Sequence, residues 1–176
     1  MKTSRRRLTR ALAGAMLATL AVLLAPAGAN AVTGAASCGI TWGSLPKTGT
    51  GAGDVTSIRA GRHDCYDRVV FDGQAGFNEV RYVTQVTTDG SGTPVPLLGG
   101  AFLQVSMRTP STSPLFHGPY PDARGFQTLR QVAGAGGFEG YESFGIGVRA
   151  RLPFRVFVVD ANGPSPRLVV DIAHKW

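Results

Sequence analysis

The stretch YDRVVFD at residues 66–72 decides the fold class of this chain, and a similar stretch, PRLVVDI, follows at residues 166–172. Each contains an arginine, three apolar residues and an aspartate in the same order. A short apolar run with a charge at each end is typical of a strand in the middle of a sheet, because its centre is buried and its ends reach the edges of the layer. The run RVFVVD at residues 155–160 repeats the pattern with one more apolar residue.

We therefore predict that residues 68–72 and 167–171 form central strands, either paired with each other or placed on facing sheets. Val70 and Val169 are then buried, and the charged residues at the strand ends lie near the layer edges. The repetition has two explanations, the physics of β-strands or an internal duplication.

Other short runs with strand-like patterns fill much of the remaining chain. Residues 79–86 and 101–108 alternate apolar and polar side chains, and clusters of Gly, Pro, Asn and Asp separate the runs. Residues 126–137 fit either a short helical turn or a strand, and residues 141–148 fit a strand with a bend or bulge at its glycines.

Residues 109–125 interrupt this pattern, because they contain four prolines and two glycines. Such a segment predicts a long surface loop. With the short strands on either side, it predicts an all-β fold: a single-domain β-sandwich of short strands with one long Pro/Gly-rich loop.

The start of the chain has the features of a secretory signal peptide. Residues 1–10 contain five basic residues and no acidic one, residues 11–25 are apolar, and residues 29–31, Ala-Asn-Ala, offer a cleavage site. The apolar run is shorter than the about 20 residues that span a bilayer. We expect residues 1–31 to be removed on export, by the general secretory or the twin-arginine route, which leaves a secreted protein with no stable membrane anchor.

Removal of this segment changes the charge. The chain has 18 basic and 11 acidic residues, but five of the basic ones lie in residues 1–10, so 13 basic residues and a net charge of +2 remain. This near-balance gives no support for a nucleic-acid partner. The rest of the chain divides into an expected flexible segment at residues 32–53 and one domain at residues 54–176.

The two cysteines, Cys38 and Cys65, follow the expected cleavage site, and an even number in an oxidising compartment predicts a disulfide. The alternative, a Cys65 nucleophile assisted by His63, lacks a third group to orient the histidine. His63, Asp64 and Asp67 match no zinc-binding pattern, and we expect them to lie in a polar turn. We predict no catalytic, cofactor or metal site, and place His174 at the surface in the C-terminal tail.

Three arginines, Arg149, Arg151 and Arg155, are the candidate ligand-binding residues, because no acidic residue separates them. Arginine binds carboxylates and phosphates through paired hydrogen bonds. The alternative is that these side chains pair with acidic residues at a sheet edge or face water.

Four segments in order, RHDCYDRVVFD, EVRYVTQVTTDGSGTPVPLLGGAFLQV, FEGYESFGIGVRARLPFRVFVVD and RLVVDIAHKW, resemble the AMIN-like domain of exported actinobacterial proteins. The resemblance covers about residues 54–176. The RLVVDI strand also resembles the broader AMIN domain, a β-sandwich found on cell-wall amidases and secretins. Its implied role is attachment of those proteins to peptidoglycan.

The resemblance implies a β-sandwich that acts outside the cytoplasm. The favoured function is non-catalytic binding at the cell envelope, with peptidoglycan or another anionic wall polymer as the partner. Two alternatives stay open: a secreted hydrolase that acts on the wall or on an extracellular substrate, and an interaction module that recruits another exported protein through a sheet edge.

Overall fold

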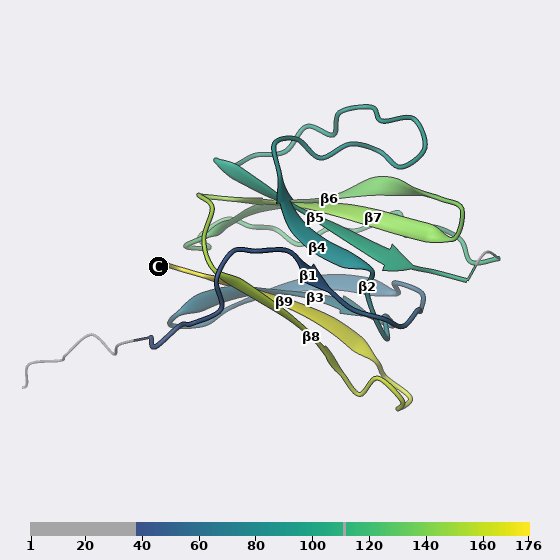
Figure 1. Cartoon of the computed structure of the whole chain (residues 1–176), viewed down its shortest axis with the longest axis horizontal. Coiled ribbons are helices and arrows are strands. Elements are labelled where there is room, and N and C mark those ends of the chain that lie inside the picture. The colour runs from purple at the N-terminus through teal and green to yellow at the C-terminus, as the bar shows by residue number, and fades with distance from the viewer. Residues whose placement is uncertain (1–37, 111) are drawn as a thin grey trace, which may run out of the picture. The chain divides into compact units, whose positions relative to one another are not determined.

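Two antiparallel β-sheets pack face to face in the computed structural model, which describes residues 38–110 and 112–176 (Figure 1). The five-stranded sheet has the order β1-β4-β5-β7-β6, and the four-stranded sheet has the order β2-β3-β9-β8. The strands are β1 (Lys47–Thr48), β2 (Ser57–Arg62), β3 (Tyr66–Asp72), β4 (Glu79–Val83), β5 (Ala101–Arg108), β6 (Leu129–Phe138), β7 (Tyr141–Val148), β8 (Phe154–Val159) and β9 (Arg167–Ala173). The predicted all-β sandwich is confirmed.

The predicted signal peptide, residues 1–31, lies outside the described residues. Within the described ranges, no helix is long and apolar enough to cross a membrane. Part of the segment expected at residues 32–53 is described, and there Lys47 and Thr48 form β1 by pairing with Val80 and Glu79 of β4.

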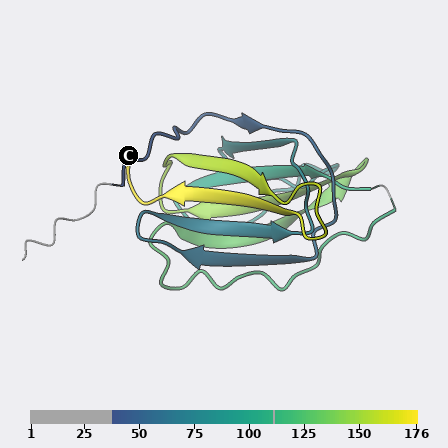
Figure 2. The ribbon, with the colours of Figure 1, turned by 90° about the horizontal axis from the view of Figure 1, so that it is seen from below.

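The repeated stretches form β3 and β9, which pair directly in the middle of the four-stranded sheet (Figure 2). The antiparallel register reverses one stretch against the other, so Arg68 lies opposite Asp171 and Asp72 lies opposite Arg167. The prediction of two central strands is confirmed. The third run, β8, pairs with β9 but forms the edge of the sheet, so the pattern alone did not distinguish a central strand from an edge strand.

The core lies between the sheets, where alternate residues of each strand point inward. Leu103, Val105 and Met107 of β5 are fully buried, as their alternation with polar residues predicts. They pack with Phe71 of β3 and Phe144 of β7, whose ring centroids are 5.2 Å apart. Full burial of such side chains stabilises the fold by about 1.5–3 kcal/mol each.

The glycines of β7 serve packing rather than a bulge. β7 pairs with β5 in one unbroken register, and the register shifts of this sheet occur in β6. Because β6 is a strand, the alternative of a helical turn at residues 126–137 is wrong. A Cβ atom on Gly145 would lie 2.5 Å from Leu97 Cδ1, and one on Gly147 would lie 2.0 Å from the Leu98 carbonyl oxygen. The connection between β4 and β5 therefore lies directly on the outer face of this sheet.

The predicted long loop joins β5 to β6 and is confirmed as irregular. It runs alongside β2 in Figure 2, where Arg62 donates a hydrogen bond to the Gly125 carbonyl oxygen at 3.3 Å. Its apolar residues Phe116, Ala123 and Phe126 pack against the core. The loop thus covers an edge strand that would otherwise be open to pairing.

Candidate functional site

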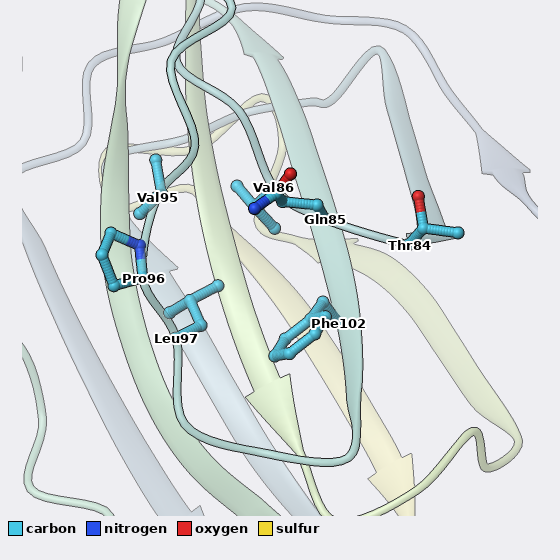
Figure 3. A pocket seen from close by; sticks show the side chains of 7 residues that line it. All are labelled: Thr84, Gln85, Val86, Val95, Pro96, Leu97 and Phe102. Carbon is cyan, nitrogen blue, oxygen red and sulfur yellow. The ribbon is translucent and has the colours of Figure 1, made fainter.

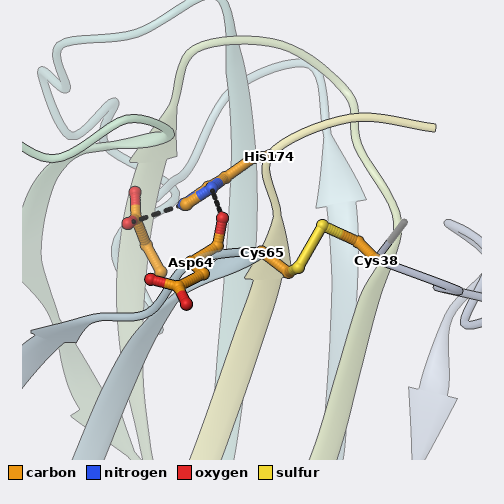
Figure 4. The surroundings of a disulfide bond; sticks show 5 residues. Cys38, Asp64, Cys65 and His174 are labelled. Atoms are coloured by element: carbon orange, nitrogen blue, oxygen red, sulfur yellow. Dashed lines mark hydrogen bonds and ion pairs between the residues drawn. A yellow bond between two sulfur atoms is a disulfide. The ribbon is translucent and has the colours of Figure 1, made fainter. Parts of the chain in front are cut away.

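The predicted disulfide is present and joins Cys38 to Cys65, in the turn between β2 and β3 (Figure 4). It closes a loop with a sequence separation of 27. Cys65 is therefore not a free nucleophile. The neighbouring His63 is exposed and stacks on Tyr66 with ring centroids 4.4 Å apart.

Reduction of this disulfide is expected to lower the free energy of unfolding by about 3–4 kcal/mol, because the unfolded chain regains the freedom that the closed loop removes. Thermal denaturation with and without reductant measures the effect. The double variant Cys38→Ala/Cys65→Ala is the control and should melt near the reduced parent, whether or not reductant is present. A parent protein that is insensitive to reductant, or that has two free thiols when unfolded, would contradict this prediction.

A buried Asp–His pair lies beside the disulfide. His174 Nε2 is 3.0 Å from Asp67 Oδ1, and His174 Nδ1 is 3.2 Å from the Asp64 carbonyl oxygen; Figure 4 shows the ring beside Asp64. The expectation that His174 lies at the surface is wrong, since the residue is only 6% exposed. Alternate residues of β9 point inward, and Ile172 is one of them. The same alternation places His174, two residues further, on the inward side, and it could have predicted the burial of this residue.

This pair connects the two sheets. The other oxygen of Asp67, Oδ2, accepts hydrogen bonds from the backbone N–H groups of Thr128 and Leu129, at the start of β6 in the facing sheet. The pair is not placed to activate a nucleophile, because both ring nitrogens of His174 already contact oxygen atoms of Asp64 and Asp67. Its role here is structural.

The outer face of the four-stranded sheet carries the most distinctive cluster of side chains. We call it the arginine–aromatic face, and it consists of Trp42, Tyr66, Arg68, Arg155, Phe157 and Asp171. The Asp171 side chain is fully buried and forms salt bridges with Arg68 at 2.6 Å and Arg155 at 2.8 Å. The hydrogen bond to Asp171 raises the pKa of Arg68.

Aromatic rings hold these two arginines in place. The Arg155 guanidinium lies 4.4 Å from the Trp42 ring centroid and 5.1 Å from that of Phe157. The Arg68 guanidinium lies 5.4 Å from the Tyr66 ring centroid. Both arginines remain partly exposed, at 27% for the side chain of Arg68 and 41% for that of Arg155. The cluster is therefore ordered and still accessible to a ligand.

The other two candidate arginines lie in the connection from β7 to β8 and have uncharged partners. Arg149 donates a hydrogen bond to the His174 carbonyl oxygen. Arg151 donates to the Ser44 carbonyl oxygen at 3.2 Å, and its guanidinium lies 4.9 Å from the Tyr82 ring centroid. The structure thus pairs Arg155 with an acidic residue, whereas the charges of Arg149 and Arg151 are not matched by an acid at salt-bridge distance among the described residues.

A separate cavity of about 490 Å³ lies on the outer face of the five-stranded sheet, between the β4–β5 connection and Phe102 (Figure 3). It is lined by Thr84, Gln85, Val86, Val95, Pro96, Leu97 and Phe102. None of these seven side chains is ionisable, so the lining by itself offers no general acid or base.

Two carboxyl groups have raised pKa values because they are buried, Asp89 and Glu142. They do not form a facing catalytic pair. Glu142 points into the sandwich, where its Oε1 accepts a hydrogen bond from the Phe116 N–H at 2.6 Å. Asp89 lies beside Ser143, on the opposite face of β7. Across residues 38–110 and 112–176, no group of three or more His, Cys, Asp or Glu side chains is placed to hold a metal ion.

Comparison with known proteins matches residues 53–174 to the model of one family, the AMIN-like domain. No curated protein and no solved structure matches the chain. The match spans well over half of the chain and includes every strand from β2 to β9. The chain therefore belongs to the AMIN-like domain family.

Proposed function

We propose that this protein is a non-catalytic binding module that acts outside the cytoplasm and attaches to peptidoglycan or another anionic wall polymer. AMIN-like domains are generally non-catalytic binding domains with a cell-envelope role. A structural disulfide fits the same oxidising compartment. Export through a cleaved signal peptide at residues 1–31 is part of this proposal.

The arginine–aromatic face is the observation that carries the proposal. Partly exposed aromatic rings provide flat apolar surfaces on which sugar rings stack, and the arginines beside them provide donors for carboxylates and phosphates. Arg68 and Arg155 share one acid, Asp171, so this part of the face keeps one positive charge in excess. Arg149 and Arg151 add positive charge nearby in sequence, and a local excess of this kind attracts anionic polymers.

Incubation of the purified protein with purified cell walls, at low and at high salt, tests the proposal. Retention of the protein at low salt without release of soluble wall fragments is the expected result. Release of soluble fragments would favour the secreted hydrolase. Absence of both retention and release would contradict wall binding and favour recruitment of another exported protein.

Replacement of two arginines by glutamine, Arg149→Gln/Arg151→Gln, is expected to weaken wall binding roughly tenfold at low salt and to flatten its salt dependence. The melting temperature should change little, because both side chains bond to carbonyl groups that can accept from other donors. A pull-down at several salt concentrations measures the affinity.

The matched control is Arg81→Gln/Arg124→Gln, which removes the same charge from arginines that are already paired with Glu79 and Asp122. This control should keep the affinity of the parent. Equal losses in the two double variants would show that net charge alone, and not the proposed arginines, drives retention.

A further inference from the structure

The β3–β9 pairing places an arginine opposite an aspartate at two positions, but only one of these two pairs forms a salt bridge. At one end, Arg68 forms a salt bridge with Asp171, which lies opposite it. At the other end, Asp72 lies opposite Arg167, but its carboxylate is occupied by Arg59 of β2. Arg59 donates two hydrogen bonds to Asp72, at 2.7 and 2.8 Å, and these lower the pKa of Asp72.

Arg167 is left without a salt bridge as a result, and it acts on Asp72 only through a weaker electrostatic attraction that also lowers the pKa of that carboxyl group. Ser57 also donates to the Asp72 carboxylate, at 2.6 Å, so that acid is already well supplied with donors. In the part of the chain that the structure describes, Arg167 makes no side-chain hydrogen bond or salt bridge, and its Nε is buried without an acceptor. The Nε atom itself is shielded, so a ligand would meet the terminal Nη groups of this half-buried side chain, which are not among the buried atoms.

Arg167 lines a cavity of about 470 Å³, and two hydrogen bonds hold its walls. The Gly73 N–H donates to the Pro166 carbonyl oxygen at 2.8 Å, which ties the end of β3 to the β8–β9 turn. The Ser165 N–H donates to Asp160 Oδ2 at 3.3 Å and fixes that turn. The cavity is therefore built from positions that are ordered before any ligand arrives.

We infer that this cavity binds an oxyanion, a carboxylate or a phosphate group carried on a larger molecule. Two arginines and one aspartate line it, Arg59, Arg167 and Asp72, so it has a net charge of +1. The two terminal Nη groups of Arg167 offer a pair of parallel N–H donors that match two oxygens of such a group, and Ser165 lies in the same lining. The volume suits a small molecule or a polymer unit rather than an isolated ion.

The oxyanion cavity is distinct from the arginine–aromatic face. Asp72 and Arg167 lie four residues along their strands from Arg68 and Asp171, which corresponds to about 13 Å. The inference does not depend on wall binding, because it rests on the lining of this cavity and on Arg167, which makes no salt bridge or side-chain hydrogen bond among the described residues.

Titration of the purified protein with inorganic phosphate and, separately, with acetate tests the inference at constant ionic strength. The backbone amide resonances of Thr56, Gly73 and Ser165 should shift and saturate with at least one of the two probes. Saturation with phosphate alone identifies a phosphate source and saturation with acetate alone a carboxylate source. Absence of saturation with both would overturn the inference.

Two variants locate the site. Arg167→Gln should weaken binding at least tenfold, because it removes the charge and the paired donors, whereas the control Arg81→Gln on the other sheet should bind as the parent does. Asp72→Asn should strengthen binding severalfold, because it removes the one negative charge in the lining and releases Arg59. If Arg167→Gln binds as tightly as the parent, the inference is wrong. If that variant does not fold, the parent and Asp72→Asn titrations still decide it.

Discussion

Asp67→Ala is expected to reduce the free energy of unfolding by about 3–5 kcal/mol and the melting temperature by more than about 10 °C. The substitution removes the shared acceptor of three buried donors: the backbone N–H groups of Thr128 and Leu129 and the ring of His174. Each donor is then left without a partner in a site that water does not reach. Since a domain of this size is stable by only about 5–15 kcal/mol, a large part of its stability depends on this one carboxylate.

Asp67→Asn should cost less than half as much as Asp67→Ala. The amide oxygen can still accept from Thr128 and Leu129, so two of the three donors keep their acceptor.

Urea denaturation of the variants measures these differences. The control is Asp122→Ala, which removes an exposed carboxylate paired with the exposed Arg124 and should melt as the parent does. A melting temperature of Asp67→Ala close to that of the parent would refute the connecting role of Asp67. Equal losses in the Ala and Asn variants would show that the charge of Asp67, rather than the number of acceptors, is what stabilises the pair.

The strands could be predicted because their signals are local. The bounds of β5 and β7 follow from alternation and from the turn residues beside them, and the two repeated stretches identified the centre of one sheet. The cysteine count was enough for the disulfide, because two cysteines in an oxidising compartment leave a single pairing.

The site depends on contacts between strands that are far apart in sequence, and these could not be predicted. The partner of Arg155 is Asp171, which is reached only once β8 is placed beside β9. The glycines of β7 suggest a bulge in the sequence. In the structure they leave space for the β4–β5 connection, which packs on them from outside the sheet. The position of His174 near the end of the chain favours the surface, whereas its partner Asp67 lies on a strand that is distant in sequence.

The final prediction compares the two aspartates of the repeated stretches, which the sequence presents as equivalent. Asp171→Ala should lower the free energy of unfolding by about 3–4 kcal/mol, because its side chain is fully buried and its loss leaves Arg68 and Arg155 without their shared acid. Asp72→Ala should cost about 1 kcal/mol or less, because Asp72 is 22% exposed and its partner Arg59 is 55% exposed and can turn to water.

Thermal and urea unfolding of the two variants under the same conditions gives the comparison. A clear difference in this direction would show that burial, and not the Arg–Asp pattern, sets the energetic value of each pair. Equal costs would contradict the assignment of Asp171 as the buried centre of the arginine–aromatic face. The partly exposed Arg59–Asp72 pair can separate at a small energetic cost, whereas separation of Asp171 from Arg68 leaves an unpaired buried charge. The same sequence pattern thus forms a buried support at one end of the sheet and lines the oxyanion cavity at the other.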